Sequence, residues 1–219
     1  MSPAIQTQAC EDRDFVEWHR GCPWCAVWVA RADVPEVAAG VAQARACIAP
    51  WLLSRYERQP HVTLAYRGLM AGSQMCPNVE FDAAQLRADV QALQSIRLSA
   101  FELQLQGVGS FSTVPYLAVH PHAALHTVHA VLAAHTPYPG WSYVPHVTVG
   151  HYACEVPLAD VLPRLQDGLS QQPLCTVPVR GLWLARYRTD DIAGVLSWEG
   201  YFDLYTQSYH AQPDAILSV

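Results

Sequence analysis

HVTLAYRG, residues 61–68, and HVTVGHYA, residues 146–153, are the two stretches of this sequence that decide its fold. They begin 85 residues apart and share histidine, valine, threonine and an aliphatic residue in the same order, each directly after a proline, Pro60 or Pro145. Both have the β-branched and aromatic content of a strand. The match predicts one structural unit that the chain uses twice.

The surrounding patterns repeat in the same way. Apolar periodicity, with glycine and proline at the breaks, predicts strands at 25–32, 61–68, 96–111, 114–120, 146–153, 175–188 and 194–206, and helices at 34–48, 82–93, 122–135 and 158–169. Asp82 is expected to cap its helix. Residues 1–24 are polar and are expected to form an irregular N-terminal extension to a single domain that covers residues 1–219.

The histidine and threonine of each motif are expected to act together. Successive side chains of a strand point to opposite faces, so residues two apart share a face. If the halves pack with approximate two-fold symmetry, four polar side chains converge on one site. They are His61, Thr63, His146 and Thr148.

This combination suits the hydrolysis of a phosphodiester. The reaction needs a base that deprotonates water and an acid that protonates the departing oxygen. Histidine, with an ordinary pKa of about 6.5, fills either role near neutral pH. The hydroxyls of Thr63 and Thr148 can donate hydrogen bonds to the charge that grows on the phosphate oxygens.

Composition and charge limit the class of protein. The chain has 219 residues, of which 51% are hydrophobic and 15% charged, so it can bury a full core. Its formal net charge of −6 argues against a broad basic surface that grips long nucleic acid, so any phosphate recognition is expected to be local. No signal-like or membrane-spanning apolar run is present, which predicts a cytoplasmic protein without membrane contact, expected to be a monomer.

The seven cysteines are an odd number in a chain of this size and mostly lie in apolar surroundings. They predict reduced, packed thiols and no disulfide framework.

The two His-x-Thr strands, the GVGSF segment between them (residues 107–111) and the closing WLARY segment (183–187) together resemble the two-histidine (2H) phosphoesterase superfamily. The most similar branch is the 2′-5′ RNA ligase-like proteins, also called RNA 2′,3′-cyclic phosphodiesterases, over residues 25–205. The resemblance implies an α+β fold with two lobes related by a pseudo-two-fold axis. Two antiparallel sheets would face a central cleft, with the helices outside. It also implies no metal and no cofactor, and a nucleotide or RNA end that bears a cyclic phosphate as the partner.

The resemblance also implies roles for single residues. His61 and Thr63 match the first motif of the family, and His146 and Thr148 match the second. The family pattern favours His146 as the base and His61 as the acid, although the sequence does not itself assign these roles. His151 stands where many relatives have an arginine that reaches the phosphate, which leaves the identity of the substrate open.

Aromatic side chains are candidates to contact the substrate, because their faces suit unpaired bases. The substrate-binding candidates are His151, Tyr66, Phe111, Trp183 and Tyr187, with Tyr116 as a further stacking candidate. Trp183 and Tyr187 share one face of the expected closing strand.

Two other groups of residues suggest different chemistry. Cys22 and Cys25, in CPWC after His19, could form half of a zinc site or a redox pair. A second such motif is absent and Cys25 begins an apolar strand, so packing at the strand entry is favoured.

The histidines at 122, 126 and 129 share a helical face that could bind zinc or nickel. No carboxylate lies at a matching spacing, and a solvated face is favoured.

The preferred hypothesis is a metal-independent phosphodiesterase that opens a nucleoside or RNA 2′,3′-cyclic phosphate. The same site could act on an ADP-ribose cyclic phosphate or carry out 2′-5′ RNA ligation. A non-catalytic nucleotide-binding module is the alternative from another class.

Overall fold

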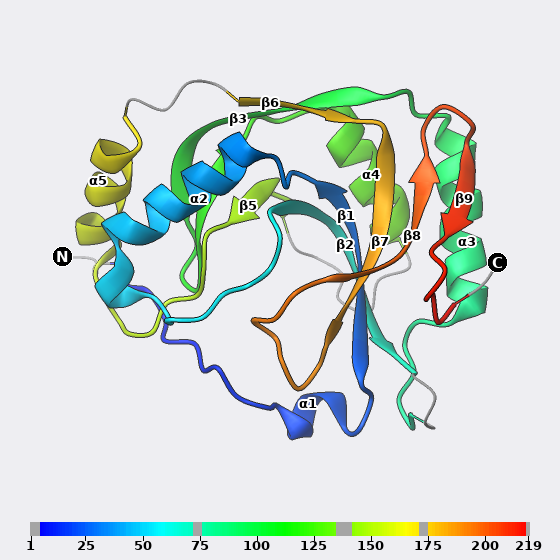
Figure 1. Cartoon of the computed structure of the whole chain (residues 1–219), viewed down its shortest axis with the longest axis horizontal. Helices are drawn as coiled ribbons and strands as arrows, with labels where there is room; N and C mark the ends of the chain where they lie inside the picture. The colour runs from blue at the N-terminus through cyan, green and yellow to red at the C-terminus, as the bar shows by residue number, and fades with distance from the viewer. Residues whose placement is uncertain (1–4, 72–75, 135–141, 171–174, 218–219) are drawn as a thin grey trace.

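The computed structural model describes residues 5–71, 76–134, 142–170 and 175–217, and these form an α+β fold (Figure 1). The strands are β1 (Trp24–Arg31), β2 (His61–Met70), β3 (Phe101–Ser110), β4 (Pro115–Val119), β5 (His146–Thr148), β6 (Cys175–Val179), β7 (Gly181–Arg188), β8 (Ser197–Asp203) and β9 (Ser208–Ala211). The helices are α1 (Val16–His19), α2 (Pro35–Cys47), α3 (Ala83–Ile96), α4 (Ala123–Ala133) and α5 (Leu158–Gly168), with a short 3₁₀ turn at Ala49–Trp51.

All the strands belong to one nine-stranded sheet in the order β6-β3-β4-β5-β2-β1-β7-β8-β9. Every neighbouring pair in it is antiparallel. The expectation of two separate sheets that face a cleft is not confirmed. Val62 of β2 pairs with Val147 of β5, and this contact joins the two halves into one sheet.

The sheet curls back on itself. Only Arg180 separates the end of β6 from the start of β7, yet five strands lie between β6 and β7 in the sheet order. In a flat sheet, strands about 4.8 Å apart would hold β6 and β7 roughly 29 Å from each other. The two residue steps from Val179 to Gly181 span at most about 7 Å. Figure 1 shows β6 running across the top of the molecule into β7.

This crossing corrects a second expectation. Residues 175–188 were expected to form one strand, but they form β6, which pairs with β3, and β7, which pairs with β1. The two segments have the same strand-like composition, and only their partners differ. Strand β9 was not anticipated at all.

Two further expectations need adjustment at their boundaries. The N-terminal extension is not wholly irregular, because α1 forms at Val16–His19. The second motif was expected to continue as a strand to residue 153, but β5 ends at Thr148. The predicted capping of α3 is confirmed, since the Asp82 side chain accepts hydrogen bonds from the backbone N–H groups of Ala84 and Gln85.

Helices α2, α3, α4 and α5 lie on one face of the sheet, and their packing forms the main core. Helix α4 contacts β2 and α3, whereas α5 contacts β3 and α2. The core takes one side chain in two from the central strands, among them Trp28, Leu64 and Leu184, which are all 0% exposed. These helices do not cover the opposite face of the sheet, which we call the site face.

A second, smaller cluster covers one end of the site face. It includes Cys25, Val29 and Tyr187, with Trp18 from α1 packed against it. Cys22 in this cluster forms a disulfide with Cys76, which corrects the expectation of reduced, packed thiols at these two positions. The pairing was not foreseen because 54 residues separate the two cysteines in the sequence.

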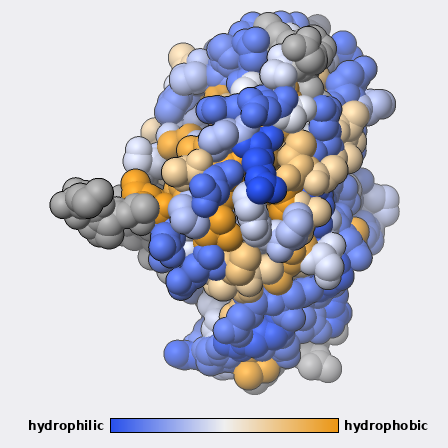
Figure 2. Space-filling model, turned by 90° about the vertical axis from the view of Figure 1, so that its left-hand side faces the viewer, coloured by the Kyte–Doolittle hydropathy of each residue, from blue (hydrophilic) through white to orange (hydrophobic). Residues whose placement is uncertain are grey.

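The outer surface is mixed in character. Seen from the end of the molecule that carries α2 and α5, hydrophobic side chains gather in the middle and hydrophilic ones cover the top and bottom (Figure 2). Among the helices in the described ranges, none has both the length and the apolar character that crossing a membrane requires.

Candidate active site

The polar side chains of the two motifs lie together on the site face. Val62 and Val147 pair across β2 and β5, and both are 0% exposed within the core. Because side chains alternate along a strand, the residues on either side of each valine point to the other face. The antiparallel register then sets each histidine across from the threonine of the other motif. We call this group the quartet; its members are His61, Thr63, His146 and Thr148.

The two imidazoles of the quartet are oriented in the same way. Nδ1 of His61 lies 2.7 Å from the carbonyl oxygen of Gln59, and Nδ1 of His146 lies 2.7 Å from that of Val144. A carbonyl oxygen only accepts, so each Nδ1–H is the donor. In a neutral ring, Nε2 is then the nitrogen that can take up a proton. The duplicated motif thus supplies two proton-transfer atoms.

Both histidines favour the neutral form. Burial lowers the pKa of His61 to about 4; the Gln59 carbonyl opposes this shift, and the charges of Arg58 and His146 add to it. Burial also lowers the pKa of His146, against the hydrogen bond to Val144. The charge interaction between the two histidines indicates that they belong to one electrostatic site. His61 is the more enclosed, at 7% exposed.

Next to the quartet lies His151, at the position where the family resemblance led us to expect an arginine. Its ring meets the edge of the Tyr56 ring at 5.3 Å between centroids. Burial lowers the pKa of His151 to about 4, helped by the charge of Arg58. Burial also raises the pKa of Tyr56, whose hydroxyl interacts with Thr148. His151 is therefore uncharged at neutral pH and brings no positive charge to the site.

Arg58 is a cation of this region that sequence reasoning missed. Its charge acts on both His61 and His151, and its guanidinium carbon lies 4.0 Å from the centroid of the Tyr187 ring. Nη2 donates to the carbonyl of Ile192 at 2.5 Å, while Nε is buried without a hydrogen-bond partner. Among the described residues, no carboxylate pairs with Arg58. No motif marks this residue; the missing arginine at 151 is the only signal that another cation was needed.

The aromatic candidates separate into different places. Phe111 and Tyr116 lie beside His146, with ring centroids 5.0 and 5.2 Å from its imidazole. Tyr187 is 7% exposed and lies beneath Arg58, so it supports that cation and offers no free face. Tyr66 packs against the smaller hydrophobic cluster that includes Tyr187.

Trp183 shares the face of the quartet but stands further along the sheet. It pairs with Val29 of β1, which in turn pairs with Thr63 of β2. The equal parity expected for Trp183 and Tyr187 is confirmed, since both lie on the site face of β7.

The two cysteines of the CPWC motif lie in different environments. Of the CPWC pair, Cys22 is in a disulfide and Cys25 is a buried free thiol at the start of β1, as expected for packing at a strand entry. In the described ranges, no cluster of three or more potential metal ligands occurs.

The histidines of α4 are engaged separately. His122 accepts a hydrogen bond at the helix N-terminus, whereas Nδ1 of His129 donates to the carbonyl of Leu64 at 2.7 Å. His126 is exposed, as a solvated face requires, but His129 is half-buried, which corrects that expectation in part.

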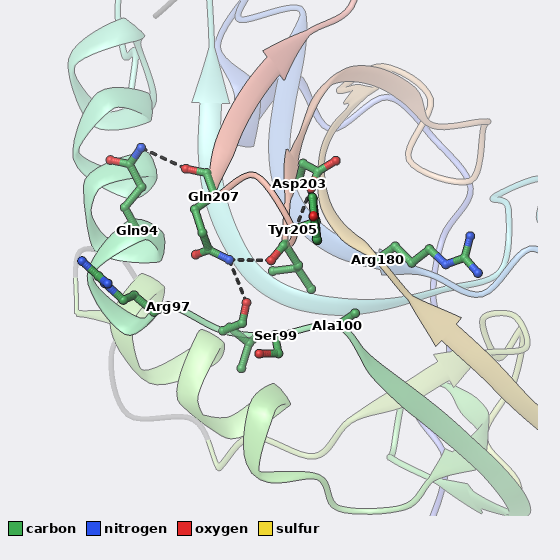
Figure 3. Close-up of a pocket in the computed structure, with 10 residues that line it drawn as sticks. Gln94, Arg97, Ser99, Ala100, Arg180, Asp203, Tyr205 and Gln207 are labelled. Atoms are coloured by element: carbon green, nitrogen blue, oxygen red, sulfur yellow. Dashed lines mark hydrogen bonds between the residues drawn. The ribbon is translucent and has the colours of Figure 1, made fainter.

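A pocket of about 840 Å³ lies away from the quartet, between the end of α3 and the turn that joins β8 to β9 (Figure 3). Its lining includes Gln94, Arg97, Arg180, Tyr205 and Gln207, and no member of the quartet. In Figure 3 the side-chain amide of Gln207 donates hydrogen bonds to two backbone carbonyls of the pocket wall, those of Leu98 and Leu204.

Comparison with known proteins identifies a family and a fold. The family model described as the 2′-5′ RNA ligase superfamily matches residues 28–191. Crystal structures of similar fold include the following two. E. coli LigT in its apo form has a TM-score of 0.56 at 17% identity, covering 83% of this chain and 97% of LigT. TT0787 of Thermus thermophilus has a TM-score of 0.55 at 16% identity, covering 82% of this chain and 97% of that one. No curated protein matches the sequence.

Proposed function

Because this chain belongs to the 2′-5′ RNA ligase superfamily, whose members are two-histidine phosphoesterases and ligases, we propose that it is a phosphodiesterase that opens a 2′,3′-cyclic phosphate at a nucleoside or RNA end. The observation that carries the proposal is the register of Val62 with Val147, which gathers the quartet on one face. The reaction needs an acid and a base on opposite sides of one phosphorus atom. In this proposal, two imidazoles from adjacent antiparallel strands supply the pair.

Each step of the proposed reaction uses an atom of the quartet. Nε2 of His146 takes a proton from water as the water oxygen forms a bond to phosphorus. His61 acts as the acid in its protonated form, which the negative charge of the bound phosphate favours against the effect of burial. The bond from phosphorus to one ribose oxygen breaks, and Nε2 of the His61 imidazolium donates its proton to that oxygen. The product is a phosphomonoester, and proton exchange with solvent restores both rings. The assignment of base and acid follows the family resemblance.

The remaining groups stabilise charge and do not transfer protons. The hydroxyls of Thr63 and Thr148 donate to the non-bridging oxygens, where negative charge grows in the transition state. The guanidinium of Arg58 is positioned to attract the phosphate, since it already acts on His61 and no carboxylate of the described residues neutralises it. The neutral His151 can add a hydrogen bond but no charge.

A panel of substrates tests this proposal. Purified protein should hydrolyse an oligonucleotide with a 2′,3′-cyclic phosphate in the presence of a chelator. The panel also includes an ADP-ribose cyclic phosphate and a pair of RNA ends that could be joined by a 2′-5′ bond. Faster turnover of either of these would replace the proposed substrate. Tight binding of nucleotides without turnover of any of them would favour a binding module.

A further inference from the structure

One row of side chains runs through the quartet across four neighbouring strands. Arg31 of β1 pairs with His61 of β2, and Tyr116 of β4 pairs with Thr148 of β5. The register of β2 with β5 sets His61 across from Thr148, so all four share the site face. The row therefore has a cation at one end, an aromatic ring at the other and catalytic candidates between them.

The Arg31 end is held rigidly. Its guanidinium donates to both carboxylate oxygens of Asp33, from Nε at 3.1 Å and from Nη2 at 2.6 Å. The guanidinium carbon also lies 4.7 Å from the ring centroids of both Trp183 and Trp198. The Arg31 side chain is 34% exposed, so part of the group remains open to a ligand.

Further aromatic rings pack beside Trp183 on the neighbouring strands. Trp183 lies 5.0 Å from Tyr201, and Tyr201 lies 5.0 Å from His210, each measured between ring centroids. These residues pair in register across β7, β8 and β9. A side chain that is braced in this way loses little freedom when it binds a ligand.

The other end is an aromatic pair. The rings of Phe111 and Tyr116 lie 4.8 Å apart at an angle of 37°, and both approach His146. Each residue is partly exposed. Aromatic faces and guanidinium planes are the two kinds of surface on which unpaired bases stack.

We infer that Arg31 with its tryptophans, and Phe111 with Tyr116, are two base platforms on opposite sides of the quartet, so that the substrate is an oligonucleotide of at least two nucleotides. The inference rests on the proposed function and narrows its substrate class. The platforms stand three strand spacings apart, or about 14 Å. One base reaches only one of them, whereas two splayed bases joined through the backbone reach both. We assign the terminal base to the Phe111–Tyr116 platform, whose rings lie 5.0 and 5.2 Å from the His146 imidazole, and the preceding base to the Arg31 platform.

The test compares a dinucleotide that ends in a 2′,3′-cyclic phosphate with the matching nucleoside 2′,3′-cyclic phosphate. The wild-type protein should favour the dinucleotide in kcat/KM by about tenfold or more, the effect of one stacked base. In Arg31→Gln this ratio should fall toward one, and Asp33→Asn, which frees the guanidinium, should lower it in the same direction. Arg87→Gln, on the exposed side of α3, is the matched control and should keep the wild-type ratio. Equal turnover of the two substrates by the wild-type protein would overturn the inference.

Binding separates this inference from the proposed reaction. Affinities for both ligands are measured by calorimetry with the double variant His61→Ala/His146→Ala, in which no turnover interferes. Tighter binding of the dinucleotide, lost on adding Arg31→Gln, supports the two platforms even if the wild-type protein hydrolyses neither ligand. Equal affinities contradict them, whatever the wild-type protein hydrolyses.

Discussion

Val62 lies directly opposite Val147, and this pair is where the first half of the sheet meets the second. Its two neighbours on either strand make up the quartet, so the geometry of the site depends on how firmly two buried valines are held. The packing of the core and the positions of the quartet side chains thus depend on the same pair of valines.

Val147→Ala should weaken both the fold and the site. Val147 is fully buried, and the cavity left by its two methyl groups should lower the free energy of unfolding by about 1–3 kcal/mol. Urea denaturation measures this change. Val195→Ala, at a residue 57% exposed, is the control and should shift the free energy by less than about 0.5 kcal/mol. Equal effects of the two substitutions would show that the junction is not tightly packed.

Stability should decrease in mild acid. Burial lowers the pKa of His61 and of His151 to about 4 in the folded protein, whereas an unfolded histidine titrates near its ordinary value of 6.5. Between these values the unfolded chain binds more protons, so the free energy of unfolding is highest above pH 6.5 and falls as the pH drops toward 4. The loss between pH 7.5 and 5 should be about 2 kcal/mol for each histidine, since about 1.5 pH units lie below the unfolded pKa at about 1.4 kcal/mol per unit.

Urea denaturation at several pH values measures this slope. His151→Asn should flatten it, because one of the titrating groups is removed. An unchanged slope in that variant would mean that His151 titrates normally in the folded state.

Arg58→Gln should impair substrate binding. A hydrogen bond to a charged group contributes about 1.5–3 kcal/mol, so removal of this cation should lower kcat/KM about 10- to 100-fold, mainly through KM. Arg58→Lys should retain part of the activity, since it keeps the charge but loses the planar fork. Arg180→Gln, in the remote pocket, serves as the control. A loss in kcat with an unchanged KM would assign Arg58 a role other than phosphate binding.

Reduction of the disulfide should destabilise the protein. Cys22 and Cys76 close a loop with a sequence separation of 54, and such a crosslink typically contributes about 2–4 kcal/mol by limiting the unfolded chain. Cys22→Ser should therefore lower Tm, and a reducing agent should lower the Tm of the wild-type protein but not that of the variant. Cys47→Ser, at a free thiol, is the control.

Much of the fold and the site could be predicted because the signals are local. The alternation of side chains in HVT is enough to put histidine and threonine on one face, and the alanine-rich spacing after Pro35 is enough to predict α2. The duplicated motif predicted that the two halves meet at these residues. Their roles in catalysis remain a prediction.

The rest depends on which segments become partners. Nothing in CTVPVRGLWLARYR shows that the chain changes its pairing partner at Arg180, from β3 near one edge of the sheet to β1 in the other half, because both halves of the segment are equally good strands. Arg58 precedes its motif in a loop and becomes important only through the folded positions of His61 and Tyr187. Such long-range pairings are set by tertiary packing.

The most direct test is the turnover of an RNA 2′,3′-cyclic phosphate by His61→Ala and by His146→Ala. Each variant should lose activity by about 10²–10⁴-fold, the contribution of one acid or base, while its thermal unfolding stays cooperative. His126→Ala, at an exposed histidine of α4, should match the wild-type protein. Retained activity in a folded His61→Ala or His146→Ala variant would contradict the claim that the two imidazoles act on one phosphorus atom.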